Sequence, residues 1–186
     1  ILGEKQDISD MGIVGHVVFN SENLKAGLEE YIRLFGVVND AVSLCLDSDE
    51  HFGYLNFIHH YPEHYCIADI ERSFVLAMCR TRKWLGKTLP LTSVHFQHQP
   101  PAYAWRYSKV FSCPVYFNQS DCQIVFEKHY FDLKPTNANP YLKTAALQYA
   151  NSLLEKFNYR SLADQVKNLI YRSIDHEETE LLKVAQ

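Results

Sequence analysis

The stretch LTSVHFQHQPPAYAWRYSKVFSCPVYFNQSDCQIVFEKHYF, residues 91–131, decides the fold class. Its alternating apolar runs and its prolines predict a strand, a helix and two further strands, at Ser93–His98, Ala102–Ser112, Val115–Asn118 and Cys122–Glu127. A β-α-β-β unit of this kind indicates an α+β domain, because strands and a helix that alternate over so few residues must pack on one another.

The residues before this stretch predict a hairpin and two helices. Val42–Asp47 alternates between apolar and polar side chains, and Gly53–His59 returns as a second strand. Ser21–Phe35 and Ile67–Leu85 carry apolar residues at helical spacing. The segment Met11–Asn20 fits a buried strand or a short buried helix, because so short an apolar run has no diagnostic period.

These elements predict a small, mainly antiparallel sheet of about five strands with helices packed on it, followed by C-terminal helices. Residues 14–36 resemble residues 93–113, and each segment precedes a predicted hairpin. The sequence therefore permits two β-α-β-β halves around the helix Ile67–Leu85, provided that Met11–Asn20 is a strand. The expected C-terminal helices are Pro140–Phe157 and Ser161–Arg172.

Length, charge and cysteine content exclude several classes of protein. A chain of 186 residues suits one globular domain, and a formal net charge of −4 disfavours a nucleic-acid surface. We find no signal-peptide pattern and no window apolar enough to span a bilayer. The five scattered cysteines favour reduced thiols in an intracellular protein. The chain starts without Met and stops within an amphipathic run, so we expect it to be part of a longer protein.

The candidate catalytic and metal-binding groups are weak. His59, His60, His64 and Cys66 are close in sequence, but Tyr61-Pro62 interrupts any helix that would align them. Cys113 falls at a predicted helix C-terminus, where the helix dipole disfavours a thiolate. We therefore predict no catalytic residue, no metal and no cofactor. An enzyme that uses Cys113 or the histidine cluster is the third interpretation.

A ligand site is the stronger candidate. Trp105 lies off the apolar stripe of its predicted helix, as expected for a pocket wall or an interface, and an arginine could pair with a ligand carboxylate. Arg72, Arg80 and Lys83 share one face of the helix Ile67–Leu85. The predicted ligand-binding residues are Tyr54, Asn56, Arg72, His95, Gln97, Trp105 and Arg106.

Residues 91–131 resemble the N-terminal effector domain of AraC/XylS-type transcription regulators, in the arabinose-binding-like subgroup. The shared pattern is F-x-H-x-x-P, an aromatic helix with Y-x-x-x-F, then Cys-Pro-Val with an aromatic pair, and an apolar strand. Upstream, MGIVGHVVFNSENLKAGLEEYIRLF is similar to the same subgroup, with His16 in place of its usual Tyr and Ala26-Gly27 in place of its Glu-Ala. Downstream, TELLKVAQ resembles the start of the helix-turn-helix region. The matching residues are Phe96, His98, Pro101, Tyr107, Phe111, Cys113–Phe117 and Ile124–Phe126.

The resemblance implies a cytoplasmic bacterial regulator in which a ligand shifts a two-state equilibrium of this domain. The expected domains are an effector-binding-like α+β domain at 1–135, a helical dimerisation or linker segment at 136–174, and the start of a helix-turn-helix domain at 175–186. The implied partners are an unidentified small-molecule effector, a second copy of the chain, and promoter DNA bound by a C-terminal domain outside this sequence. The alternative is a dimerisation or protein-interaction module with no small-molecule effector.

Overall fold

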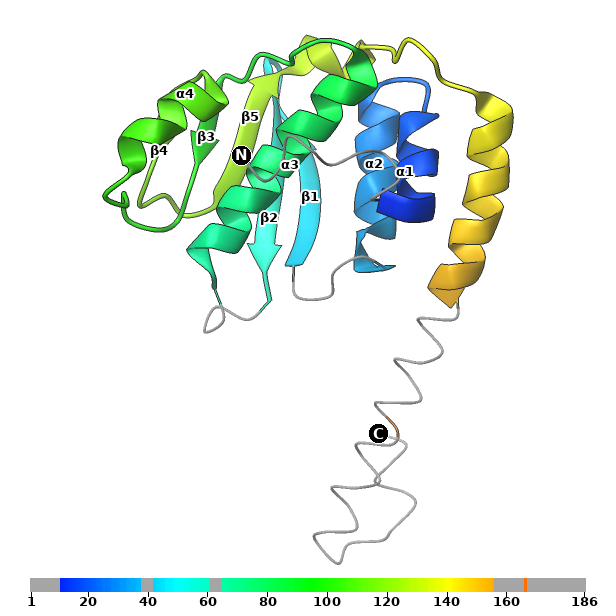
Figure 1. Cartoon of the computed structure of the whole chain (residues 1–186), viewed down its shortest axis with the longest axis horizontal. Coiled ribbons are helices and arrows are strands. Elements are labelled where there is room, and N and C mark those ends of the chain that lie inside the picture. The colour runs from blue at the N-terminus through cyan, green and yellow to red at the C-terminus, as the bar shows by residue number, and fades with distance from the viewer. Residues whose placement is uncertain (1–10, 38–41, 61–64, 156–165, 167–186) are drawn as a thin grey trace, which may run out of the picture.

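The computed structural model describes residues 11–37, 42–60, 65–155 and 166. Two helices, two strands and a long helix come first, namely α1 (Gly12–Phe19), α2 (Leu24–Leu34), β1 (Val42–Ser48), β2 (Phe52–His59) and α3 (Ile67–Leu85) (Figure 1). They are followed by β3 (Ser93–His95), α4 (Tyr107–Phe111), β4 (Val115–Tyr116), β5 (Cys122–Glu127) and a helix over residues 140–155. Short 3₁₀ turns occupy Phe35–Val37, Ala104–Arg106 and Lys128–Asp132.

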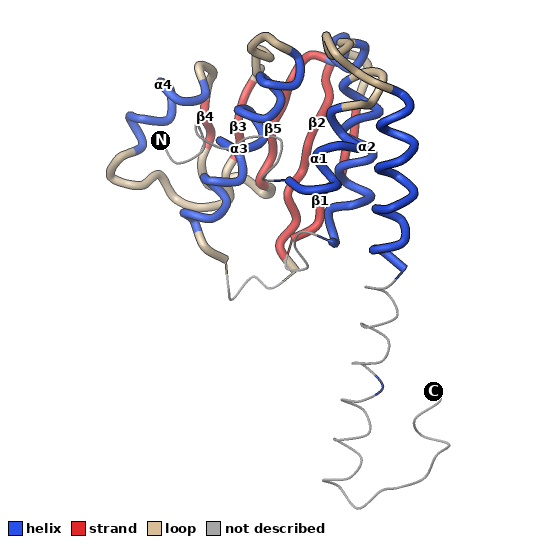
Figure 2. Tube along the Cα trace, turned by 45° about the vertical axis from the view of Figure 1, so that its right-hand side comes forward, coloured by secondary structure: helices blue, strands red, loops and turns tan. Residues whose placement is uncertain are grey.

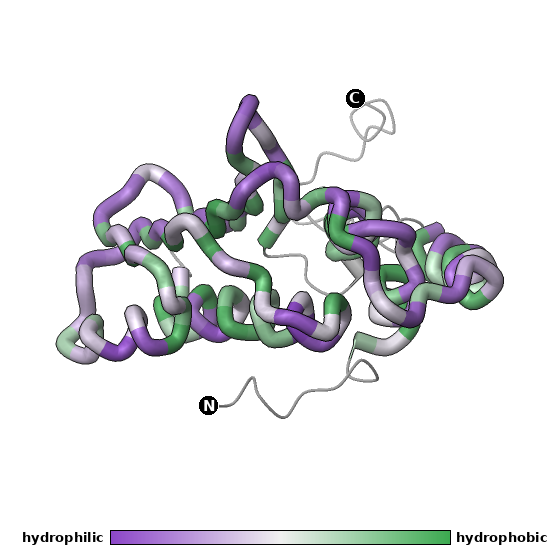
Figure 3. Tube along the Cα trace, turned by 90° about the horizontal axis from the view of Figure 1, so that it is seen from above, coloured by the Kyte–Doolittle hydropathy of each residue, from purple (hydrophilic) through white to green (hydrophobic). Residues whose placement is uncertain are grey.

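The five strands form one sheet in the order β1-β2-β5-β3-β4. The pair β3–β4 is parallel, and the other neighbouring pairs are antiparallel. The helix α3 crosses one face of this sheet, and α1 and α2 lie beside the β1 edge (Figure 2). Figure 3 shows the helices from above, with hydrophilic and hydrophobic segments alternating along them. The predicted α+β class with a mainly antiparallel sheet is confirmed.

The hairpin β1–β2 and the helix α3 have the predicted positions because local chemistry defines their ends. The carboxylate of Asp49 accepts the backbone N–H groups of His51 and Phe52 at 2.7 Å each and so closes the turn between the strands. Gly86 ends α3 with a φ of +66°, a left-handed conformation that glycine adopts without strain.

An aromatic core fixes α3 to the sheet. Phe74 of α3 stacks on Phe96 with ring centroids 4.9 Å apart and contacts Phe57 of β2 at 4.5 Å. Phe96 also contacts Tyr107 and Phe111 of α4, at 5.5 and 6.1 Å. Burial of these rings removes large apolar areas from water, so this cluster contributes much of the hydrophobic stabilisation.

A second, smaller core joins α1 and α2 to the helix 140–155. Its buried residues are Val14, Val17, Val18, Leu34, Ala146 and Ala150. Polar contacts support it, because Arg33 donates to Asn151 at 2.8 Å and the backbone N–H of Asn139 donates to Asn20 at 2.9 Å. The predicted helix Pro140–Phe157 is therefore present over residues 140–155. The predicted helix Ser161–Arg172 lies outside the described residues, apart from the helical Val166.

Three finer expectations about the domain differ from the structure. Met11–Asn20 contains the helix α1, whose Val14, Val17 and Val18 occupy one buried helical face. The first half is therefore α-α-β-β, and the permitted repeat of two β-α-β-β halves is not present. The strands β4 and β5 are not a hairpin, because β3 lies between them, with the Val94 N–H donating to the Pro114 carbonyl at 3.0 Å. The predicted helix Ala102–Ser112 is reduced to a 3₁₀ turn and the short α4.

Gly27 permits the closest contact between α2 and α3. A Cβ at this position would lie 2.1 Å from the Cη2 atom of Trp84, whose indole N–H is held by the Phe19 carbonyl at 3.0 Å. We predict that Gly27→Ala lowers the free energy of unfolding by about 1–3 kcal/mol, as other overpacking substitutions do. Urea unfolding measures this change. The matched control is Gly36→Ala, where a Cβ would meet no atom within 4 Å, and equal effects of the two substitutions would contradict the predicted contact.

Candidate functional site

Three of the predicted ligand-binding residues lie on the sheet face that points away from α3. Leu55 and Phe57 of β2 are buried beneath α3, so the alternating Tyr54 and Asn56 point to the opposite face. His95 of β3 is on that same face, because it pairs with Gln123, which in turn pairs with Asn56.

Hydrogen bonds connect the polar side chains of this face. The Asn56 amide donates to Asp47 at 2.9 Å and accepts from Gln123 at 2.6 Å. The Tyr54 hydroxyl donates to Asp49, and together with the backbone N–H groups of the turn it lowers the pKa of this carboxyl to about 2. We infer that these groups satisfy one another across the sheet, since each donor and acceptor named here has a protein partner.

The side chain of His95 is held by its own strand and by β4. Its Nε2 atom lies 2.9 Å from the Ser93 hydroxyl, and its ring meets Tyr116 edge-on at 5.3 Å. Burial lowers the pKa of His95, because the charged imidazolium loses hydration there. His95 therefore lies on the same polar surface as Tyr54 and Asn56.

The other four predicted residues lie in separate places. Gln97 donates to the Ser120 carbonyl at 2.6 Å and borders a shallow hollow of about 440 Å³. Trp105 is 61% exposed, and the Arg106 guanidinium lies 5.1 Å from its ring centroid. Arg72 of α3 pairs with Asp69 at 2.6 Å and lines an apolar cavity. The structure thus brings Tyr54, Asn56 and His95 to one surface, and it does not gather all seven residues around one ligand.

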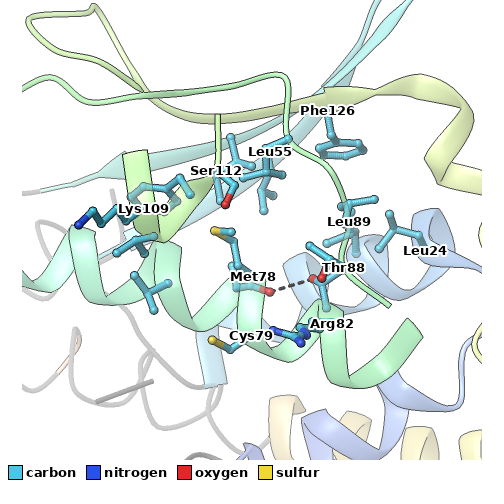
Figure 4. Close-up of a pocket in the computed structure, with 18 residues that line it drawn as sticks. Leu24, Leu55, Met78, Cys79, Arg82, Thr88, Leu89, Lys109, Ser112 and Phe126 are labelled. Atoms are coloured by element: carbon cyan, nitrogen blue, oxygen red, sulfur yellow. Dashed lines mark hydrogen bonds between the residues drawn. The ribbon is translucent and has the colours of Figure 1, made fainter. Parts of the chain in front are cut away.

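Two cavities lie beside α3. The first, which we call the α4-side cavity, has a volume of about 360 Å³ and lies between α3, α4, the loop at 86–91 and the sheet (Figure 4). The second, the α2-side cavity, has a volume of about 320 Å³ and lies between α3, α1, α2 and strand β2. Four residues line both cavities: Leu28, Leu55, Ala77 and Thr81. Volumes of this size and apolar walls with a few polar groups are typical of small-molecule sites.

The polar groups of the α2-side cavity were only partly foreseen. Arg72 precedes Arg80 by eight residues, so helical spacing places both on the same face of α3. This spacing was the signal in the sequence that Arg80 lies near Arg72. No local pattern indicates that Tyr31 of α2 forms a hydrogen bond with Arg80. Burial raises the pKa of Tyr31, and the positive charge of Arg80 opposes that rise.

The carboxylate of Glu71 joins α3 to α4. Glu71 of α3 accepts hydrogen bonds from the hydroxyls of Tyr107 and of Tyr103, the latter at 3.0 Å. Burial, followed by the contact with Glu71, raises the pKa of Tyr107, so this phenol keeps its proton and remains a donor. This contact fixes the first residue of α4, whose last residues border the α4-side cavity.

In the described ranges, no group of three or more His, Cys, Asp or Glu side chains is arranged to hold a metal ion, and His64 falls outside those ranges. None of the helices within the described part of the chain is both long and apolar enough to cross a bilayer.

The sequence and fold define the class of protein. Residues 1–135 match the family described as the arabinose-binding domain of AraC transcription regulator, N-term. The chain therefore belongs to the family of N-terminal arabinose-binding domains of AraC transcription regulators, and the resemblance inferred from residues 91–131 is confirmed.

Two individual proteins are similar to the chain. It is 24% identical over 172 residues to the ornithine utilization regulator of Pseudomonas aeruginosa, which covers 91% of this chain and 51% of that regulator. The crystal structure of transcriptional regulator CdpR from Pseudomonas aeruginosa has a TM-score of 0.67 at 15% identity, over 83% of this chain and 52% of that chain. The similarity to the CdpR structure shows the fold alone. The chain spans about half the length of each of these regulators.

The environment of Cys113 allows a test of the enzyme interpretation. Burial raises its pKa to about 11, so only about one thiol in a thousand is ionised at pH 8. We predict that iodoacetamide labels Cys113 far more slowly than the exposed Cys66, as followed by peptide mass spectrometry at pH 8. Rapid labelling of Cys113 in the folded chain would revive the interpretation that it is a nucleophile.

Proposed function

We propose that this chain is the effector-sensing part of a cytoplasmic AraC-type transcription regulator, and that its effector binds in the cavities beside α3. DNA binding would belong to a helix-turn-helix module of the same regulator. The observation that carries the proposal is the pair of cavities between α3 and the sheet, in a chain that belongs to this regulator family. Cavities of this size, with apolar walls and a few polar groups, are typical of small-molecule sites, and this supports the proposal.

The packing of α1 suggests how effector binding is transmitted to the helix 140–155. The α2-side cavity is lined by Met11, Val18 and Phe19 around α1, and α1 packs on Ala146 and Ala150 of the helix 140–155. A ligand that prefers one position of α1 therefore biases the position of that helix, since packed elements move between discrete arrangements. The helix 140–155 is the connection towards the residues that follow in the sequence.

Not all of the ligand-binding residues predicted from the sequence line the proposed cavities. Arg72 lines the α2-side cavity, and we keep it as an effector contact. Tyr54, Asn56 and His95 lie across the sheet from that cavity, so we propose for them a separate polar surface. Gln97, Trp105 and Arg106 line neither of the two cavities, so under this proposal we expect their substitution to leave effector binding unchanged.

Ligand binding to the native state must raise the melting temperature with concentration. At about a hundredfold excess over Kd the stabilisation is about 2.7 kcal/mol. We predict that one compound in a panel of sugars, amino acids, short carboxylic acids and fatty acids gives a saturable thermal shift. Ala77→Leu, which enlarges a side chain in the wall of both cavities, should reduce this shift at a fixed ligand concentration.

The matched control for that experiment is Ala68→Leu on the exposed side of the same helix. It makes the same substitution outside the cavities and should respond as the unmodified chain does. No shift with any compound, or equal shifts in both variants, would reject the proposed cavities as the effector site.

The second candidate function is a dimerisation module without an effector. It is favoured by the helix 140–155, which exposes Tyr141, Leu142 and Tyr149 at 87%, 54% and 57%, and Leu142 and Tyr149, seven residues apart, lie on one face of it. Exposed apolar side chains gathered on one helix face are typical of an interface between proteins. A second copy of this chain is the partner that we propose for this face.

We predict that the chain sediments as a dimer and that Tyr149→Glu shifts it to the monomer, because a carboxylate in an apolar interface loses hydration without a partner. Sedimentation velocity measures the change, and Gln148→Glu on the adjacent exposed position is the control. A dimer that survives Tyr149→Glu would exclude this helix face as the interface. A dimer without any thermal shift would favour the second function over the first.

A further inference from the structure

The α2-side cavity combines cationic groups with an apolar wall. Its polar lining consists of Arg72, Ser73, Arg80 and Thr81 from α3 and Tyr31 from α2. These side chains can donate hydrogen bonds, and two of them carry a permanent positive charge. None of the described residues that line the cavity is acidic. Such a lining is complementary to an anion and lacks the carboxylate that an ammonium group would need.

The positions of the two arginines suit a ligand that enters from the surface. The Arg72 side chain is 54% exposed, and its pairing with Asp69 contributes little to stability, so its guanidinium can turn to a ligand. Arg80 is less exposed than Arg72, lies about two helical turns further along the same face of α3, and forms a hydrogen bond with Tyr31. A guanidinium is not deprotonated in proteins, so this part of the cavity keeps its positive charge at all physiological pH values.

The remaining residues around the α2-side cavity are apolar, and some of them also line the α4-side cavity. Ten of the fifteen residues around the α2-side cavity are apolar, which leaves few partners for the many hydroxyl groups of a sugar. The shared residues Leu28, Leu55 and Ala77 also face the α4-side cavity, whose walls continue with Met78, Leu89, Leu91, Val110, Ile124 and Phe126. The two cavities are therefore adjacent and share part of their walls, and the α4-side cavity also contains Arg82 and Lys109.

We propose that the effector is an elongated amphipathic acid, namely a monocarboxylate with a long unbranched apolar chain. Its carboxylate pairs with Arg80 and Arg72 in the α2-side cavity, and its chain passes over Leu55 into the α4-side cavity. This inference rests on the proposed function and adds the chemical class of the ligand. It also separates this domain from sugar and amino-acid sensors, because the cavity has neither a dense polar lining nor an acidic group among its described residues.

Calorimetric titration of the 186-residue chain with hexanoate, decanoate and tetradecanoate, each below its micelle concentration, tests the ligand class. Affinity should rise by up to about fourfold for each methylene that becomes buried. Decanol, which has the same chain without the charge, should bind at least about tenfold more weakly than decanoate, because a hydrogen bond to a charged group is lost. Equal affinities of decanol and decanoate would overturn the assignment of the carboxylate site.

A matched pair of arginine variants tests the orientation of the ligand, that is, which cavity holds its carboxylate. Arg80→Gln should weaken decanoate binding by about tenfold or more and leave decanol binding unchanged. Arg82→Gln, two residues away on the α4 side of the same helix, should keep the preference for decanoate over decanol, because the proposed carboxylate position does not reach Arg82. The reverse result would place the carboxylate near Arg82 and Lys109 and overturn the proposed orientation. If Arg80→Gln fails to fold, Arg72→Gln at the exposed mouth is the variant to measure.

Ala77→Leu tests whether one chain occupies both cavities. It should weaken tetradecanoate more than hexanoate, because only the longer chain must pass Ala77. Equal weakening of both acids would overturn the two-cavity arrangement. If the acids fail to bind but a sugar or an amino acid gives a thermal shift that Ala77→Leu reduces, the ligand class is wrong and the proposed function stands. If no compound binds, the proposed function fails as well.

Discussion

The packing of Phe74 on Phe96 and Phe57 is the contact on which the rest of the structure depends. Phe74 and Phe96 are fully buried, and their rings fix one side of α3 against the centre of the sheet. The two cavities lie beside α3, and the core residues Phe57 and Phe111 form part of their walls. The position of the candidate site therefore depends on how this aromatic core holds α3 on the sheet.

The small core around α1 gives this site a connection to the remainder of the chain. Val14, Val17 and Val18 contact the helix 140–155, while the adjoining residues of α1 line the α2-side cavity. A regulatory domain needs both features, namely a ligand site and an element whose position the ligand can bias. In the proposed mechanism one short helix, α1, contributes to both, and its low polarity explains why its type was ambiguous in the sequence.

Elements that depend on local chemistry were predicted with the correct positions. The hairpin β1–β2 has an Asp49 turn and alternating side chains, and α3 has a helical period and the terminal Gly86. The arrangement of β3, β4 and β5 was not predictable in this way, because strand partners are chosen across the whole sheet. Likewise, the predicted helix around Trp105 is only a 3₁₀ turn and a short α-helix, and the exposure of the Trp105 ring depends on how these turns pack.

The sequence by itself determined the family, the α+β class, most element types, and the presence of Arg72 and Arg80 on one face of a helix. These properties follow from residue order and spacing, which act over a few neighbouring positions. Only the tertiary structure decided that Tyr31 reaches Arg80, that Leu28 and Leu55 border both cavities, and that Tyr54 and His95 lie on the opposite face of the sheet from Arg72. A cavity is the space that packed elements leave unfilled, so its lining depends on contacts between segments that are distant in the sequence.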